Sequence, residues 1–431
     1  MSHPSFKLAI IGFGTVGEGV YRTIEKKSEK LVTLLGRSLE IPYVIVKNTD
    51  KEREVGEKTL VTNEFDTVIN DRSLDVVIEA TPDAETGLPY VKQLLQEGIS
   101  VVSANKELIA TYGDELYEIA SDHGCHLLFE AAVAGGIPLL NTLRHTLKTN
   151  TIDRLEGIVN GTSNFILTKM RQEGAPFSQA LSEAQEKGFA EAVPDKDVDG
   201  WDAYFKTNIL SQWIYGRSPV WNDQAPIGIR HIHVDDLVLA HQLNGKIKHI
   251  AKLRKHGDRV DGSVKPSFVL HDHPLYSVEA ENNGIHIQGS IVGSVMLQGP
   301  GAGKYPTASA IIEDVVNLLS GKHETVEHEG IEFVEHGFVE NDGKSEEERS
   351  LWFVTGGRKL EKCLNYVDAE LLHSLVRENQ KVATIVHEHE DKMKELQVLA
   401  KGTIQVYPIL GDKGDILSTH LEVLNKNTVS F

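Results

Sequence analysis

Cysteine is scarce in this sequence, and long apolar runs are absent from it. Cys125 and Cys363 are the only 2 cysteines among 431 residues, and neither has neighbours at metal-ligand spacing. This excludes a disulfide framework and a zinc site, and it suits a reducing compartment. No run reaches the roughly 18 apolar residues of a transmembrane helix. The N-terminus lacks the charged and apolar regions of a signal peptide, so we expect a cytoplasmic protein.

Positive charge is also scarce. The chain has 44 Lys and Arg against 63 Asp and Glu, which gives a formal net charge of −19. Such a charge opposes binding to nucleic acid or to an anionic membrane. The histidines form no metal-ligand pattern: His271 and His273 lie in an expected turn, and His387 and His389 alternate on an expected strand. A globular protein with a small-molecule partner remains, and its length predicts two or three domains.

Short apolar strands alternate with helices over residues 1–135. We expect strands at 7–11, 41–46, 75–79, 100–103 and 126–129, and helices at 17–29, 88–97 and 114–123. This alternation predicts an α/β domain built on a doubly wound parallel sheet. A further helix at 306–320 is expected to return to this domain.

The rest of the chain divides into a middle domain, a linker and a small C-terminal domain. Residues 136–320 predict an α+β domain, with strands at 154–159, 267–270, 276–280 and 284–292 and helices at 178–187, 201–215 and within 234–256. Residues 321–349 are rich in acidic residues without a period and predict a solvated linker. Residues 350–431 predict an α+β domain of β-α-β-α-β order, with strands at 351–355, 381–387 and 403–410 and helices at 369–378 and 390–400.

A glycine-rich loop, Gly12-Phe13-Gly14-Thr15-Val16-Gly17, follows the first expected strand. In this G-x-G-x-x-G pattern, Gly12 permits a tight turn, Gly14 lets the backbone approach a pyrophosphate, and Gly17 allows close packing of helix on strand. The helix N-terminus behind the loop offers free N–H groups to an anion. A glycine turn without a ligand is the alternative, but the strand–loop–helix context favours a Rossmann dinucleotide-binding site.

The end of the second expected strand bears on the choice of cofactor. NAD enzymes usually carry an acid there, which holds the ribose 2′-hydroxyl. This chain has Lys47 and Asn48 instead, with Lys51 and Arg53 close behind. A cation at this place pairs well with a 2′-phosphate, so Lys47 favours NADP over NAD. The alternative is an ordinary exposed lysine at a strand end.

Acids and a lysine cluster around the start of the helix expected at 201–215. Asp202 and Lys206 are spaced i,i+4 and share one helical face, while Glu191 and Asp197 precede the helix. A carboxylate beside Lys206 would keep its ammonium charged and oriented, as a proton donor to a forming alkoxide requires. An equally weighted alternative has Asp199 as the N-cap and Asp202–Lys206 as a weak surface pair.

Two further segments are rich in small residues. Residues 130–138 follow a strand and offer carbonyl oxygens and one carboxylate, the ligands of a hard monovalent cation; a packing loop between domains is the alternative. Residues 299–310 form a second glycine-rich turn that leads into a helix. That turn either closes over the cofactor or anchors the return helix.

Taken together, residues 7–320 resemble the homoserine dehydrogenase family. The resemblance rests on motifs in a specific order: IGFGTVG, VVSANKELIA, FEAAVAGGIPLL, GIVNGTSNFIL, the block from ALSEAQEKGFAE to DAYFKTNIL, HPL at 273–275, and GPGAGKYPTASA. It implies reduction of aspartate 4-semialdehyde to homoserine with a reduced nicotinamide cofactor, on the route to threonine, methionine and isoleucine. It also implies a homodimer, or a higher homo-oligomer, formed through the middle domain.

The resemblance also implies roles for individual residues. Lys206 would be the proton donor, Asp202 would position it, and Lys106 would be a second active-site lysine near substrate and nicotinamide. Glu191 and Asp197, with Asp202, would bind the substrate and its amine. Positions matching cofactor contacts are Phe13, Gly14, Thr15, Val16, Thr81, Gly188 and Gly303. A sodium-type site would use the Glu130 side chain and the carbonyls of Val133, Gly135 and Ile137.

The C-terminal 80 or so residues resemble the family less. Many relatives end in a ferredoxin-like ACT domain that senses an amino acid, and the expected β-α-β-α-β order is compatible with an ACT-like regulatory or oligomerisation domain.

Two other functions are alternatives to this interpretation. A phosphorylating semialdehyde dehydrogenase needs a nucleophilic cysteine, for which Cys125 is poorly placed. A non-catalytic nicotinamide-binding regulator would keep the glycine loop and lack the Lys206–Asp202 pair.

Overall fold

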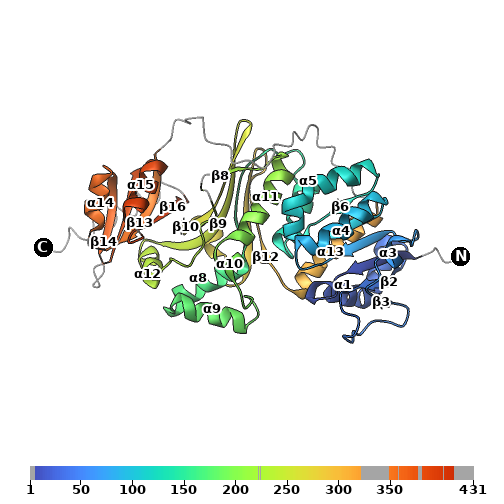
Figure 1. Cartoon of the computed structure of the whole chain (residues 1–431). Helices are drawn as coiled ribbons and strands as arrows, with labels where there is room; N and C mark the ends of the chain where they lie inside the picture. The colour runs from blue at the N-terminus through green and yellow to red at the C-terminus, as the bar shows by residue number, and fades with distance from the viewer. Residues whose placement is uncertain are drawn as a thin grey trace.

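The computed structural model describes residues 5–411 apart from 222, 224, 322–348, 358, 377–380 and 401. The expected linker at 321–349 therefore lies almost wholly outside the described residues, as does the end of the C-terminal region. The described chain forms three units that follow one another across the molecule, from the blue N-terminal unit to the red C-terminal one (Figure 1). None of the described helices is long and apolar enough to cross a membrane.

The N-terminal unit contains a six-stranded parallel sheet in the order β3-β2-β1-β4-β5-β6. Its strands are β1 (Phe6–Ile11), β2 (Leu39–Ile45), β3 (Leu60–Thr62), β4 (Val76–Glu79), β5 (Ser100–Ser103) and β6 (Leu127–Leu128). The chain order reverses between β1 and β4, which is where ligands bind in doubly wound sheets. The predicted Rossmann fold is confirmed.

Helices cover both faces of this sheet, because its central strands are apolar on both sides. They are α1 (Thr15–Lys26), α2 (Ser28–Leu35), α3 (Asp66–Ile69), α4 (Ala84–Gln96) and α5 (Lys106–Asp122). Leu8 and Ile10 of β1 face the core with α1 and α2, whereas Ala9 and Ile11 face the core with α4 and α5. The predicted return helix is α13 (Lys304–Leu319), which packs against α1.

A second sheet of ten strands runs through the middle and C-terminal units. Its middle-unit strands are β7 (Ile152–Ile158), β8 (Val220–Trp221), β9 (Gly245–His256), β10 (Arg259–Leu270), β11 (Asn282–Gly289) and β12 (Gly293–Pro300). The helices of this unit are α6 (Ala131–Ala134), α7 (Leu139–Asn141), α8 (Gly161–Glu173), α9 (Phe177–Glu186), α10 (Asp195–Val198), α11 (Trp201–Tyr215) and α12 (Val234–Gln242). The predicted helix at 201–215 matches α11.

The helix predicted within 234–256 is confirmed as α12, which ends at Gln242 because Asn244 takes a left-handed backbone with φ 55° and β9 follows. Other predictions for the middle unit are wrong. No strand lies at 276–280, since Pro274–Ser277 forms a 3-10 turn. The expected strand at 284–292 is the first half of a hairpin whose second half, β12, was not predicted. Helix α8 was not predicted either.

The C-terminal unit comprises β13 (Ser350–Gly356), α14 (Leu360–Tyr366), β14 (Glu370–Val376), β15 (Val382–Glu388), α15 (Glu390–Ala400) and β16 (Gln405–Leu410). The helix predicted at 369–378 is wrong: its leucines recur with helical spacing, but the segment pairs with β15 as a strand. The order is therefore β-α-β-β-α-β with the strands arranged β16-β13-β15-β14, a ferredoxin-like unit.

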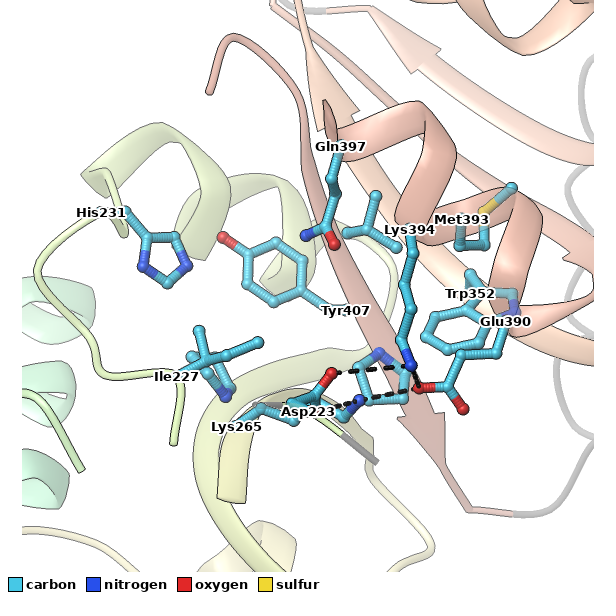
Figure 2. A pocket seen from close by; sticks show the side chains of 13 residues that line it. Asp223, Ile227, His231, Lys265, Trp352, Glu390, Met393, Lys394, Gln397 and Tyr407 are labelled. Atoms are coloured by element: carbon cyan, nitrogen blue, oxygen red, sulfur yellow. Dashed lines mark hydrogen bonds and ion pairs between the residues drawn. The ribbon is translucent and has the colours of Figure 1, made fainter. Parts of the chain in front are cut away.

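The ferredoxin-like unit is joined to the middle unit by backbone pairing and buried contacts. Strand β16 pairs in parallel with β10, and the rings of Phe268 and Phe353 stack at 4.5 Å. The Thr355 hydroxyl donates to the buried Asp236 carboxylate at 2.6 Å. Figure 2 shows a pocket between the two units, lined by side chains of both. On its wall, Lys265 forms ion pairs with Asp223 at 2.9 Å and Glu390 at 3.1 Å.

Candidate active site

The glycine loop has the geometry that a dinucleotide needs. Gly12 has φ 90°, and a Cβ there would lie 2.4 Å from the Ala80 carbonyl oxygen. A Cβ on Gly17 would lie 2.0 Å from the Gly12 carbonyl oxygen. A Cβ on Gly14, in contrast, would meet nothing within 4 Å, and no side chain caps the α1 N-terminus. The loop thus leaves open space over free N–H groups, which fits a pyrophosphate.

The end of β2 presents cations to the same edge of the sheet. Lys47 is exposed just beyond β2, and Arg53 donates to the Asn48 carbonyl at 2.8 Å. The pKa of Asp83, the N-cap of α4 beyond the end of β4, is lowered chiefly by hydrogen bonds from Thr86, with smaller contributions from Lys196 and Lys47. Lys47 therefore stands within electrostatic reach of the loop after β4.

The predicted lysines and acids meet where the N-terminal and middle units face each other. Asp202, on the first turn of α11, is 2% exposed. Its Oδ2 accepts from Lys206 Nζ at 2.9 Å, and its Oδ1 pairs with Nζ of Lys106, which starts α5 of the Rossmann domain. Lys206 also donates to the Val159 carbonyl at 2.8 Å. The structure thus brings Lys106, Asp202 and Lys206 together around one carboxylate.

Asn160, which sequence reasoning missed, organises this cluster. It caps the N-terminus of α8, and its Nδ2 donates to Asp202 and to Asp197, both at 2.8 Å. The signal for it was the turn between β7 and a small-residue stretch, Asn160-Gly161-Thr162. Through Asn160, Asp197 is therefore linked to Asp202.

Charge controls the protonation of these groups. Burial alone would raise the pKa of Asp202, but Lys106 and Lys206 outweigh it and hold that pKa well below its usual range. Asp202 in turn raises the pKa of Lys106. Burial and the neighbouring Asp202 raise the pKa of Asp197. The surface-pair alternative is wrong, since Asp202 and Lys206 are buried and Asp199 pairs with Arg230 instead of capping α11.

Glu191 is placed differently from the other predicted acids. It lies exposed on the loop between α9 and α10, and its carboxylate makes no hydrogen bond or ion pair with a described residue. Its backbone carbonyl accepts from Gln185 Nε2 at 3.0 Å. Gly188, with φ 74°, ends α9 before this loop, and Gly303, with φ 116°, precedes α13.

The predicted cation segment is buried and already hydrogen-bonded. Glu130 is 2% exposed, and its two oxygens accept from the N–H groups of Leu140 at 2.8 Å and Asn141 at 2.6 Å. Burial, followed by the neighbouring Asp314, raises the pKa of Glu130 to about 7. The segment 130–138 packs closely against the segment 299–310. The contact leaves no room for a side chain at Gly135, where a Cβ would lie 2.2 Å from the Gly301 carbonyl oxygen.

Cys125 is unsuited to nucleophilic catalysis. It is buried, and desolvation raises the pKa of its thiol to about 11. Only a thiolate attacks a carbonyl efficiently, so the phosphorylating semialdehyde dehydrogenase reading loses its required nucleophile.

Comparison with known proteins agrees with this geometry. Family models described as the NAD-binding domain of homoserine dehydrogenase and as homoserine dehydrogenase match residues 12–130 and 138–316. The homoserine dehydrogenase of Bacillus subtilis is 40% identical over 316 residues, 73% of this chain and 73% of that protein. The enzyme of Lactococcus lactis is 36% identical, covering 72% of this chain and 74% of that protein.

Solved structures are similar beyond the N-terminal units. The homoserine dehydrogenase of Thiobacillus denitrificans has a TM-score of 0.81 at 29% identity, over 95% of this chain and 99% of that one. A hyperthermophilic archaeal homoserine dehydrogenase in complex with NADPH has a TM-score of 0.64 at 29% identity, over 74% of this chain and 99% of that one. By these matches, its nicotinamide-binding domain and its fold, the chain belongs to the homoserine dehydrogenase family of oxidoreductases.

Proposed function

We propose that the chain interconverts L-aspartate 4-semialdehyde and L-homoserine with a nicotinamide cofactor. The observation that carries the proposal is the Lys106–Asp202–Lys206 cluster between the Rossmann edge and the middle unit, in which Asp202 and Lys206 are buried. A non-catalytic nicotinamide-binding regulator would not need two lysines held on one desolvated carboxylate. The cofactor supplies the two-electron reduction when it is bound.

Lys206 is the proton donor in this proposal. Its ammonium is held by Asp202 and by the Val159 carbonyl, which fixes its direction and leaves its remaining proton for the substrate oxygen. Asp202 stays ionised and holds both lysine side chains in place as negative charge develops on that oxygen. Lys106 adds a second positive charge from the cofactor-binding side.

The substrate amine is assigned to Asp197 and Glu191. Asp197 is held by Asn160 beside the lysine cluster. Glu191 is exposed on a loop and must turn toward Asp197 to reach the same amine. Both carboxylates would attract the amine in preference to a neutral side chain.

NADP is the proposed cofactor, with NAD as the alternative. Gly12 and Gly17 permit the tight loop, Gly14 leaves room for the pyrophosphate, and Lys47 offers a cation to a 2′-phosphate. The remaining proposed contacts are Phe13, Thr15, Val16, Thr81, Lys106, Gly188 and Gly303.

Further properties are proposed from the family. A sodium-type cation would bind Glu130 with the carbonyls of Val133, Gly135 and Ile137. A homodimer through the middle unit is supported by edge strand β12, whose outer side pairs with no described strand. The C-terminal unit would be an ACT-like regulatory domain, and the protein would act in the cytoplasm on the route to threonine, methionine and isoleucine.

Oxidation of L-homoserine at high pH, followed as formation of reduced cofactor, tests substrate and reaction together. We expect turnover with NADP⁺ and a higher KM with NAD⁺. No turnover with either cofactor would reject the proposed function. Calorimetric titration with threonine tests the regulatory domain separately; no heat and no inhibition would argue against a threonine sensor.

A further inference from the structure

Glu79 is a buried carboxyl group with no part in the chemistry described above. It ends β4 at the point where the strand order reverses, and its side chain is 0% exposed. Among the described residues, no Lys, Arg or His forms an ion pair with it. A buried carboxyl without a countercharge costs folding free energy, whereas an aliphatic side chain here would extend the core. Stability alone therefore does not account for Glu79.

The partners of Glu79 are four hydrogen-bond donors from two neighbouring segments. Its Oε1 accepts from the Thr81 N–H at 2.8 Å and from the Thr81 hydroxyl. Its Oε2 accepts from Ser103 Oγ at 2.5 Å, and Asn105 Nδ2 lies 3.4 Å from Oε1. Burial raises the pKa of Glu79, and these donors act against that effect.

Each of these segments leads into the candidate active site. Thr81 begins the loop after β4 and is a proposed cofactor contact. Asn105 caps α5 by accepting from the Leu108 N–H at 3.1 Å, and it directly precedes Lys106. Asn105 Nδ2 also donates to the Asp83 carbonyl at 2.8 Å, which ties the loop to the start of α5.

Helix α4 closes this network with a glycine. A Cβ on Gly87 would lie 2.8 Å from Thr81 Oγ1, 3.0 Å from Asn105 Nδ2 and 3.1 Å from Glu79 Oε1. The helix backbone therefore sits directly on the three polar groups. Any larger residue at 87 must displace at least one of them.

We infer that Glu79 is a positioning residue that fixes both the cofactor-facing loop 81–83 and Lys106. It acts through Thr81 and Asn105 and touches neither substrate nor cofactor. The inference rests on the proposed function, because Thr81 and Lys106 have their roles only there. Misplacement of such groups by about 1 Å can cost up to about 10²-fold in rate.

The experiment compares two pairs of full-length variants. Glu79→Leu removes the acceptor, and Val76→Ala destabilises the same strand without touching the donors. Gly87→Ala pushes on the network, and Gly113→Ala adds a methyl to α5 in ordinary contact with Ile109, at 3.5 Å. For each variant, kcat, the KM for NADPH, the KM for aspartate 4-semialdehyde and Tm are measured.

Glu79→Leu and Gly87→Ala are expected to raise the KM for NADPH and lower kcat, each by about 10-fold or more. Val76→Ala and Gly113→Ala should keep both constants near wild type whatever their Tm, and Glu79→Gln, which keeps one acceptor oxygen, should recover most of the loss. If Gly87→Ala and Glu79→Leu both kept the wild-type kcat and KM for NADPH, the inference would be overturned. If Glu79→Leu does not fold, wild-type constants in Gly87→Ala would be enough to overturn it. Absence of turnover in the wild type would instead reject the proposed function.

Discussion

Asp202 and Glu130 are both buried carboxylates, but their surroundings differ in the sign of the nearest charge. Asp202 lies between two lysines, which hold its pKa well below the usual range in spite of burial. Glu130 accepts from backbone N–H groups and lies near Asp314, and its pKa is raised to about 7. Burial is nearly equal at the two sites, so the neighbouring charges decide the protonation state.

The comparison distinguishes two roles of a buried carboxylate. Asp202 is ionised at any physiological pH and can keep lysines charged and oriented. The pKa of Glu130 is raised to about 7, so the proposed cation would compete with a proton there near neutral pH. The predictions below test this separation.

Replacing Lys206 should have the largest effect. Lys206→Met removes the proton donor and should lower kcat by about 10²- to 10⁴-fold. Lys206→Arg keeps a positive charge near Asp202 but cannot release a proton near neutral pH, so it should also be slow. Steady-state kinetics of both variants give the answer. Near wild-type kcat in the arginine variant would mean that charge, not proton transfer, is the contribution of Lys206.

Asp202→Asn should come next, with kcat lowered by about 10- to 10²-fold because both lysines lose their anchor. Asp202 raises the pKa of Lys106, so the variant should move the alkaline limb of the pH–rate profile to lower pH. The pKa of Asp202 is lower in the folded protein than in the unfolded chain, where it is about 3.9. Asp202 therefore stabilises the fold at pH values above about 3.9, and this stabilisation is lost as the pH falls through the folded-state pKa. The difference in unfolding free energy between wild type and Asp202→Asn should therefore become smaller at acid pH. If neither this difference nor the pH–rate profile changed as described, the assigned role of the Asp202 charge would be contradicted.

Glu130→Gln should affect stability more than chemistry. The folded-state pKa is raised to about 7, so the wild type gains stability from this group at low pH and loses it as the pH rises through about 7. The glutamine variant should lack this part of the pH dependence in Tm. At about pH 8, Na⁺ should raise the Tm of the wild type and not of the variant. If Na⁺ raised the Tm of both proteins equally, Glu130 would not be a ligand of the proposed cation.

Thr355→Val should have the smallest effect on activity. It leaves Asp236 buried without its hydroxyl donor and should destabilise the chain by about 1–3 kcal/mol. Ser374→Ala, which removes a hydroxyl bond inside the C-terminal unit, is the control. Chemical denaturation and kcat are measured for both. A loss of kcat at unchanged stability would show that the docking contact reaches the active site.

The parts of the fold that follow from local patterns could be predicted. Strands such as 7–11 and 75–79 are short apolar runs because both faces are buried, and the glycine loop requires its turn. The segment at 370–376 was misread as a helix because its leucines recur with helical spacing, while its pairing with β15 depends on residues further along the chain. Pairing with β15 therefore determined the structure of this segment, in spite of the helical spacing of its leucines.

The site was predictable in part. Spacing placed Asp202 and Lys206 on one helical face, but it could not give their burial or the contact with Lys106, since Lys106 precedes them by about 100 residues on another domain. Asn160 and Glu79 were missed because each is a single polar residue at a strand end. For Glu79 the available signal was a polar residue that closes an otherwise apolar strand.

A structure of the chain with NADP⁺ and L-homoserine tests the central assignment most directly. It should place Lys206 Nζ within hydrogen-bond distance of the substrate hydroxyl oxygen, with Asp202 still between Lys206 and Lys106. A bound complex in which Lys206 points away from that oxygen and another acid faces it would contradict the account.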